Sequence, residues 1–302
     1  MRYWVGVTDN RWFNFLSQRN PDEVNFWHPS GRPPFKYLDL GAPFLFKLKK
    51  PNHHVAGGGY FVKYSSLPLS MVWDAFGEKN GAGDRATFEA MIRRLAPDPS
   101  AKDPYVGCSV LTEPFFLAPS EWLPAPADWA SNNVRGQYYD SEQGYGAALW
   151  ASIQARFEHY QAIAHEEAPR YGKPTLVRPR LGQGGFQVSV LDAYDRRCAI
   201  TGERTLPTLE AAHIRDYAKL GPHDVRNGLL LRADFHKLFD AGLVTITPDL
   251  NVEVSPKIRE QWFNGKAYYR LHGQRLANLP ANDREHPGRE YLTWHNENQF
   301  QG

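Results

Sequence analysis

Four residues in the second half of the chain are of types that assist hydrolysis: His213, Asn227, His236 and Asp240. The first three follow one another at spacings of 14 and 9 residues, and Asp240 lies four residues after His236. Residues 232–241 are predicted to be helical, so His236 and Asp240 share one face of that helix. An imidazole beside a carboxylate suits a divalent ion such as Mg²⁺, Mn²⁺, Ni²⁺ or Zn²⁺. The alternative interpretation of this pair is an ion pair on the helix surface.

The sequence around these residues resembles a nuclease family. The segment CAITGERTLPTLEAAHIRDYAKLGPHDVRNGLLLRADFHKLFDAGLVTITPDL resembles HNH endonucleases, and more narrowly the branch that reads AAHI, then NG-L-L-R, then H-LFD-G. The resemblance covers about residues 178–300 and implies a ββα-metal fold. It implies that His213 is the general base, that His236 and Asp240 bind one divalent metal ion per active site, and that Asn227 fixes the loop that orients the base. The implied catalytic residues are therefore His213, Asn227 and His236.

The chemistry of phosphodiester hydrolysis accounts for these residue types. A water molecule must be made nucleophilic, and the leaving 3′-oxygen must be stabilised. An imidazole that is neutral near pH 7 takes a proton from water, which is the role expected of His213. A metal ion stabilises negative charge on the phosphate and on the leaving oxygen. The alternative for His213, a buried core histidine, is disfavoured because the whole motif is present.

One position departs from the pattern of many HNH nucleases, which place Asp or His as a metal ligand immediately before the base. That position is Ala212 here. Glu210 lies two residues earlier in an extended segment, so it faces the same side and is an alternative ligand. The cysteine pairs that often bind a structural zinc in this family are missing, and Cys198 is expected to be a small buried residue.

The N-terminal half has a different pattern, which is rich in strands. Four apolar or alternating segments are predicted strands: 3–8, 43–48, 55–62 and 105–111. Three glycines within 55–62 indicate a bulge or a close approach of two backbones. Residues 84–95 predict an amphipathic helix with Asp84 as its N-cap. The predicted fold class is α+β, with a recognition domain and trailing helix at 1–165, a linker at 166–181 and the nuclease domain at 182–302.

The N-terminal part resembles the PUA-like superfamily, which includes EVE, ASCH and SRA-type domains. The segments that carry this resemblance are YWVGVT at 3–8, GAPFLFKLK at 41–49, HVAGGGYFVKYS at 54–65 and YVGCSVL at 105–111. The resemblance implies a pocket that reads a nucleobase by aromatic stacking and by hydrogen bonds to its edge. Five residues are candidates for that pocket: Trp27, Asn52, Tyr60, Trp73 and Asp74. For each of them the alternative is a core or surface position.

Arginines close to the nuclease motif are candidates for contacts with the DNA backbone. Residues 168–191 contain no acid but include Arg178 and Arg180, and such a basic stretch can follow phosphates. Arg215 and Arg232, within the motif segment, are further candidates. The alternative for all four is a solvated surface.

Composition narrows the classes of protein that remain. The 302 residues carry 42% hydrophobic and 14% aromatic residues, which excludes a disordered polyelectrolyte. The two cysteines, Cys108 and Cys198, form no CxxC motif, and this usage fits a reducing cytoplasm. No window approaches 18 consecutive apolar residues, so we expect no membrane partner.

These observations predict a metal-dependent DNA endonuclease of restriction type. The resemblance implies that it cleaves double-stranded DNA that carries a modified base, 5-methylcytosine or 5-hydroxymethylcytosine. Cutting both strands needs either two active sites or the repositioning of one site, and the first of these suggests a homodimer. Two alternatives remain: an HNH endonuclease that acts on unmodified DNA, and a catalytically silent protein that binds modified DNA, which Ala212 would favour.

Overall fold

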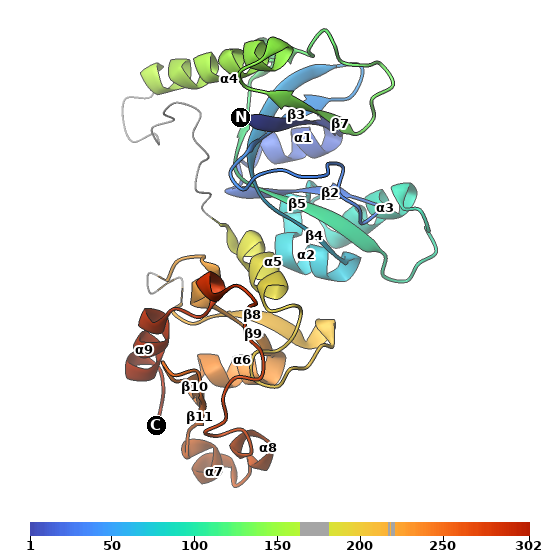
Figure 1. The fold of residues 1–302 in the computed structure, drawn as a ribbon. Helices are drawn as coiled ribbons and strands as arrows, with labels where there is room; N and C mark the ends of the chain where they lie inside the picture. Colours follow the sequence, from blue (N-terminus) through green and yellow to red (C-terminus); the bar gives the residue numbers. More distant parts are fainter. Residues whose placement is uncertain (164–180, 217, 219–220) are drawn as a thin grey trace. The chain divides into compact units, whose positions relative to one another are not determined.

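The computed structural model describes residues 1–163, 181–216, 218 and 221–302. The chain divides into two compact units, Met1–Gly185 and Phe186–Gly302, which are called unit 1 and unit 2 below (Figure 1). Each unit contains helices and strands, so the predicted α+β class is confirmed. The predicted linker lies outside the described residues except for Leu181.

A seven-stranded sheet forms the centre of the described part of unit 1. Its strands are β1 (Arg2–Thr8), β2 (Glu23–His28), β3 (Pro43–Leu48), β4 (His54–Pro68), β5 (Tyr105–Phe116), β6 (Leu123–Pro124) and β7 (Gly136–Asp140). The strand order is β2-β5-β4-β3-β1-β7, with β6 paired to β4. Strands β1 and β3 are parallel, and the other pairs are antiparallel.

Helices cover both faces of this sheet. The α-helices described in unit 1 are α1 (Asn10–Ser17), α2 (Leu69–Phe76), α3 (Arg85–Leu95) and α4 (Gly144–Ile163). Successive side chains of a strand point to opposite faces. Phe46 of β3 accordingly packs against Trp12 of α1, whereas Leu45 lies in the cluster that contains Trp150 of α4. Helices α1 and α4 therefore lie on opposite faces.

Two local predictions for unit 1 are confirmed. The β4–β5 register shifts between Gly58 and Tyr60. At Gly57 a Cβ atom would lie 2.3 Å from the carbonyl oxygen of Phe115, so the backbones approach too closely for a side chain. Asp84 caps α3, because its carboxylate accepts a hydrogen bond from the backbone N–H of Thr87 at 2.8 Å.

Unit 2 contains the strand–strand–helix order that the motif predicted. Helix α5 (Gln183–Ala193) precedes its other described elements, which are β8 (Leu209–His213), β9 (Gly228–Arg232), α6 (Ala233–Asp240), β10 (Val244–Ile246), β11 (Val252–Val254), α7 (Lys257–Trp262), α8 (Lys266–Tyr269) and α9 (Arg289–Asn298). Strands β8 and β9 pair antiparallel, with His213 opposite Gly228. Helix α6 follows β9 directly and buries Phe235 and Phe239. This β8–β9–α6 arrangement holds His213 at the end of β8, and it holds His236 and Asp240 on α6.

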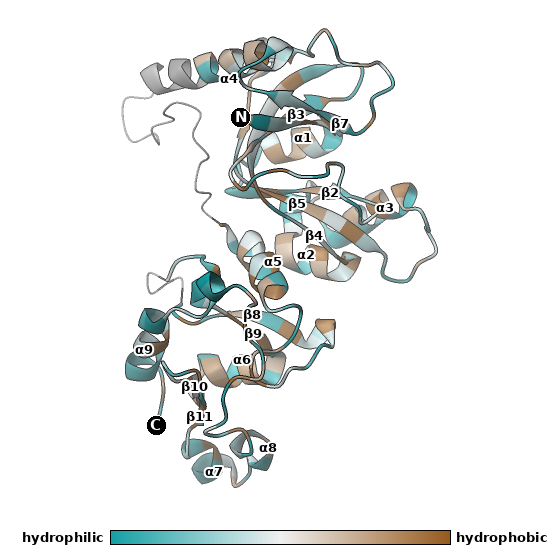
Figure 2. Cartoon of the chain, in the orientation of Figure 1, coloured by the Kyte–Doolittle hydropathy of each residue, from teal (hydrophilic) through white to brown (hydrophobic). Residues whose placement is uncertain are grey.

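The last helix is mainly a surface element of unit 2. Figure 2 shows that α9 is largely hydrophilic, and its buried side chains are Leu292 and His295. The His295 ring stacks on Phe239 with centroids 3.8 Å apart and forms a hydrogen bond with the Thr245 hydroxyl.

Among the helices described in either unit, none combines the length and the apolar character needed to cross a membrane.

Candidate active site and a cavity in unit 1

His213, the expected base, lies at the end of β8 in a partly buried position. Its ring stacks on Phe186, with centroids 3.8 Å apart and planes 11° apart. Its Nε2 atom lies 3.0 Å from Nδ1 of His223. Burial, with smaller contributions from the charges of His223 and His236, lowers the pKa of His213 to about 4, against an opposing contribution from Asp216. The imidazole is therefore neutral at pH 7, which is the state that accepts a proton.

Asn227 is fully buried and uses its whole amide on backbone groups. Its Oδ1 accepts a hydrogen bond from the backbone N–H of Arg215 at 2.9 Å. Its Nδ2 donates to the carbonyl oxygens of Arg215 and Pro222, each at 2.9 Å. The side chain thus fixes the start and the end of the loop that follows His213. Such support holds a functional side chain in place.

His236 and Asp240 lie next to each other on α6, as their spacing predicted. The His236 Nε2 atom is 3.3 Å from Asp240 Oδ2, and the His236 Nδ1 atom is 2.6 Å from Glu210 Oε2 on β8. Burial, together with the negative charges of Asp216 and Glu210, raises the pKa of Asp240, although His236 opposes this. Asp240 is thus a carboxylate crowded by other carboxylates, as is typical of sites that bind a cation.

This donor set fits one divalent metal ion. His236 Nε2 and Asp240 Oδ2 would be the ligands, while Glu210 would orient the imidazole through Nδ1, an arrangement common around metal-bound histidines. In the described part of the chain, no three His, Cys, Asp or Glu side chains are placed to bind one ion together. Ala212 is buried and offers no ligand atom. Water and phosphate oxygens would therefore complete the coordination.

The candidate phosphate-binding arginines differ in their surroundings. Arg232 forms a two-point ion pair with Asp234, at 2.6 and 2.7 Å, and the pKa of that carboxyl is lowered mainly by this pairing. The guanidinium of Arg215 lies 5.3 Å from the centre of the Trp294 ring. Arg178 and Arg180 lie outside the described residues. Phosphate contacts by these arginines stay a prediction.

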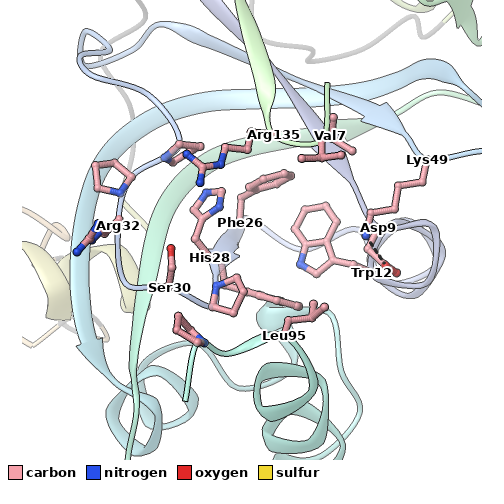
Figure 3. Close-up of a pocket in the computed structure, with 16 residues that line it drawn as sticks. Val7, Asp9, Trp12, Phe26, His28, Ser30, Arg32, Lys49, Leu95 and Arg135 are labelled. Atoms are coloured by element: carbon pink, nitrogen blue, oxygen red, sulfur yellow. Dashed lines mark hydrogen bonds and ion pairs between the residues drawn. The ribbon is translucent and has the colours of Figure 1, made fainter. Parts of the chain in front are cut away.

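Unit 1 contains a cavity of about 850 Å³ with aromatic walls (Figure 3). Phe26 and Trp12, both buried, form part of its lining, together with the half-buried Trp27. Exposed cationic side chains also line it: Arg32, Lys49 and Arg135. Lys49 is paired with Asp9 at 3.1 Å, whereas within the described part of unit 1 the guanidinium groups of Arg32 and Arg135 have no hydrogen-bond or ion-pair partner. The cavity therefore combines aromatic surface with positive charge.

Only Trp27 of the five predicted base-reading residues lines this cavity. Tyr60 is buried in β4, and Asn52 lies in the turn before it, where its carbonyl contacts the ring of His54. Trp73 packs on Phe88 with ring centroids 5.9 Å apart, and Asp74 forms an exposed ion pair with Arg85 at 3.7 Å. The structure thus does not bring the five residues together in this cavity.

His28, another lining residue, makes stability sensitive to acid. Burial, with the charge of Arg135, lowers the pKa of His28 to about 4, against 6.5 when unfolded. Between these values the unfolded chain binds more protons, so stability rises with pH. We expect the free energy of unfolding to fall by about 2 kcal/mol from pH 7 to pH 5 through this residue. Urea titrations of wild type and His28→Gln at both pH values measure this fall in the free energy of unfolding. An equal fall in the variant would show that His28 is not its cause.

Several contacts at these sites were not predicted. Phe186 and His223 contact the candidate general base His213, and Arg135 lines the unit 1 cavity. Glu210, which the sequence offered as an alternative metal ligand, contacts Nδ1 of His236. Glu210 had a signal, because alternation along β8 places it on the side of Ala212. Phe186 and Arg135 come from segments outside the motif, and His223 lies within the motif segment at a position to which the motif gives no role.

Comparisons with known proteins agree with the motif. Residues 198–247 match the model of the HNH endonuclease family, which confirms the predicted resemblance for the segment that carries the four motif residues. A search of curated proteins finds no match. Among solved structures, ASCH from Zymomonas mobilis is 12% identical, with 49% of this chain and 94% of that chain covered and a TM-score of 0.34. The modification dependent TagI restriction endonuclease is 16% identical, with 93% of this chain and 76% of that chain covered and a TM-score of 0.29.

Proposed function

We propose that this protein is a metal-dependent endonuclease that cleaves DNA carrying a modified base, 5-methylcytosine or 5-hydroxymethylcytosine. The observation that carries the nuclease half is the β8–β9–α6 arrangement, within a segment that matches the HNH endonuclease model. It places a neutral imidazole, an amide that fixes the adjoining loop, and a histidine–carboxylate pair in one small region.

His213 takes the proton of the attacking water in this proposal. The neutral ring accepts the proton as the water oxygen bonds to phosphorus and the bond to the 3′-oxygen breaks. Asn227 keeps the backbone after His213 in place, so that the base stays aligned while it changes charge. A bound divalent ion supplies stabilisation of charge on the phosphate and on the leaving oxygen. His236 and Asp240 would hold that ion, and Glu210 would keep His236 oriented.

The cavity of unit 1 supports the second half of the proposal, the selection of a base. A base that leaves the stack needs an aromatic pocket, and its flanking phosphates need cations. The side chains of Trp27 and Phe26 offer the first, and Arg32 and Arg135 offer the second. The described residues hold a single candidate site, which would cut one strand. We further propose that two copies of the chain act together to cut both strands, which light scattering of the DNA-bound protein would test.

Replacing Trp27 by leucine tests the cavity. We expect kcat/KM on modified DNA to fall about 10-fold or more, because stacking on an aromatic side chain contributes about 1–3 kcal/mol per base. Trp73→Leu is the matched control, since Trp73 and Trp27 both pack on Phe88, at 5.9 and 6.0 Å, but only Trp27 lines the cavity. Steady-state cleavage of one modified duplex measures both variants. Equal losses of kcat/KM in the two variants would argue against this cavity as the site that binds the modified nucleobase.

A panel of matched duplexes decides between the proposal and its alternatives. The same sequence is prepared with cytosine, 5-methylcytosine or 5-hydroxymethylcytosine and is incubated with the protein and Mg²⁺, Mn²⁺ or Ni²⁺. We expect cleavage of a modified duplex alone. Equal cleavage of all three would instead support an HNH endonuclease of unmodified DNA. Tight binding of a modified duplex, without cleavage in the presence of any of the three metals, would support a catalytically silent protein that binds modified DNA.

A further inference from the structure

His223 contacts the candidate base in a way that bears on which of its nitrogens accepts the proton. We propose that His223 is a positioning residue, which holds His213 as the tautomer whose Nδ1 atom accepts the proton from water. The inference rests on the proposed function of His213 as general base. It adds a residue to the site that neither the motif nor the family match assigns.

The geometry leaves one nitrogen of His213 available. Stacking on Phe186 fixes the plane of the ring, because the planes are only 11° apart at a centroid distance of 3.8 Å. Within that plane the 3.0 Å contact between His213 Nε2 and His223 Nδ1 fixes the direction of the ring. Within the described residues, Nδ1 of His213 has no hydrogen-bond partner. It is the atom of this ring that can accept a proton from water.

The hydrogen bond also determines where the proton of the neutral ring lies. A neutral imidazole carries one N–H donor and one acceptor nitrogen. If His213 donates from Nε2 to Nδ1 of His223, then Nδ1 of His213 keeps its lone pair and acts as the base. If His223 donates instead, Nδ1 of His213 carries the hydrogen and cannot accept another. Catalysis by His213 thus requires His223 to be an acceptor at Nδ1, with its own hydrogen on Nε2.

The same contact is useful after proton transfer. His213 then carries a positive charge in a partly buried position, where burial disfavours that charge. Its Nε2–H still donates to Nδ1 of His223, so the hydrogen bond becomes a charge-assisted one. The other charged or titratable groups that act on His213 are Asp216, which favours the charged form, and His236, which opposes it.

No other side chain of the motif performs this role. All three hydrogen bonds of the Asn227 amide go to backbone groups of Arg215 and Pro222, so Asn227 reaches the base only through the loop. Phe186 fixes the plane of the His213 ring but offers no hydrogen-bonding atom. The orientation of Nδ1 within that plane therefore depends on His223.

Two substitutions in the full chain separate positioning from folding. His223→Ala removes the acceptor, and His223→Asn returns an oxygen acceptor close to the position of Nδ1. We expect kcat to fall about 10- to 100-fold in His223→Ala, the range found when the group that orients a catalytic ligand is lost. KM should stay within about twofold, and His223→Asn should recover most of kcat. The matched control is His286→Ala, which should cleave like wild type. His286 is a histidine of unit 2 whose ring forms a hydrogen bond with the backbone oxygen of Pro280.

The outcomes distinguish this inference from the proposed function. If His213→Ala cleaves like wild type, the proposed base is wrong and the inference falls with it. If His213→Ala is inactive while His223→Ala cleaves like wild type, only the inference is overturned. Equal loss in His223→Ala and His223→Asn also overturns it, because the role would then be structural.

A measurement without DNA gives an independent answer. Nitrogen-15 shifts of labelled histidines report which ring atom carries the hydrogen. We expect His213 to be protonated at Nε2 in wild type and in His223→Asn, and to lose this preference in His223→Ala. Protonation of His213 at Nδ1 in the wild-type protein would overturn the inference.

Discussion

Cleavage by His213→Ala is expected to be about 1,000-fold slower than cleavage by the wild-type protein, within the 10²- to 10⁴-fold range of general-base catalysis. The ring of His213 is neutral at pH 7 because burial lowers its pKa to about 4, and alanine offers no atom that can accept a proton. Single-turnover cleavage of a modified duplex at pH 7.5 measures the effect. Affinity for DNA should change little, because His213 acts in the chemical step.

Two observations keep this result interpretable. His286→Ala serves as the control, since His286 is a partly exposed histidine of the same unit whose bond goes to Pro280. Thermal unfolding of each variant reports whether the fold survives. A His213→Ala protein that is folded and cleaves at the wild-type rate would show that another group activates the water.

Asn227→Ala is expected to lower the free energy of unfolding of unit 2 by about 3 kcal/mol and to reduce cleavage at least 100-fold. The fully buried amide makes three hydrogen bonds to the backbone, and each contributes roughly 1 kcal/mol. Without them the loop after His213 loses the groups that join its ends, so the base no longer keeps one orientation. Urea unfolding and single-turnover cleavage measure the two effects.

Asn278 provides a control for the stability effect alone. Its amide also bonds two backbone carbonyls of unit 2, those of Tyr194 and Arg197, at 2.7 and 3.3 Å. Asn278→Ala should therefore lose stability while the folded protein still cleaves at close to the wild-type rate. If Asn227→Ala lost stability but kept its cleavage rate in the same way, the amide would have no part in aligning the base.

The nuclease motif was predictable because its residues are linked by short-range rules. His236 and Asp240 meet because they lie one helical turn apart, at 3.3 Å between Nε2 and Oδ2. The pairing of β8 with β9 sets His213 opposite Gly228, and this brings Asn227 next to the end of β8. The N-cap at Asp84 was predictable for the same reason, since it joins two residues, Asp84 and Thr87, that lie three positions apart.

The residues that contact the general base His213 were not predictable from such short-range rules. His223 lies ten residues after His213, and its position depends on the path of the intervening loop. Phe186 lies on α5, 27 residues before His213, and reads in the sequence as an ordinary core residue of a helix. Contacts of this kind depend on tertiary packing, which no periodicity records.

The base-reading candidates show the same limit more clearly. Residues as far apart as Val7 and Arg135 line the cavity of unit 1, so its lining depends on the order of the strands in the sheet. An aromatic residue predicts stacking wherever it lies, and Trp73 is no more marked in the sequence than Trp27. Only the fold separates the residue that lines the cavity from the four that do not.

Restoration of metal to a stripped protein shows whether a divalent ion and His213 together cleave modified DNA. The protein is treated with EDTA, dialysed and mixed with a duplex that contains 5-methylcytosine or 5-hydroxymethylcytosine, and then Mn²⁺ or Mg²⁺ is added to wild type and to His213→Ala in parallel. We expect no cleavage before the metal is added, cleavage by the wild type after it is added, and little or no cleavage by the variant. Equal cleavage by both proteins, or cleavage that persists in EDTA, would contradict it.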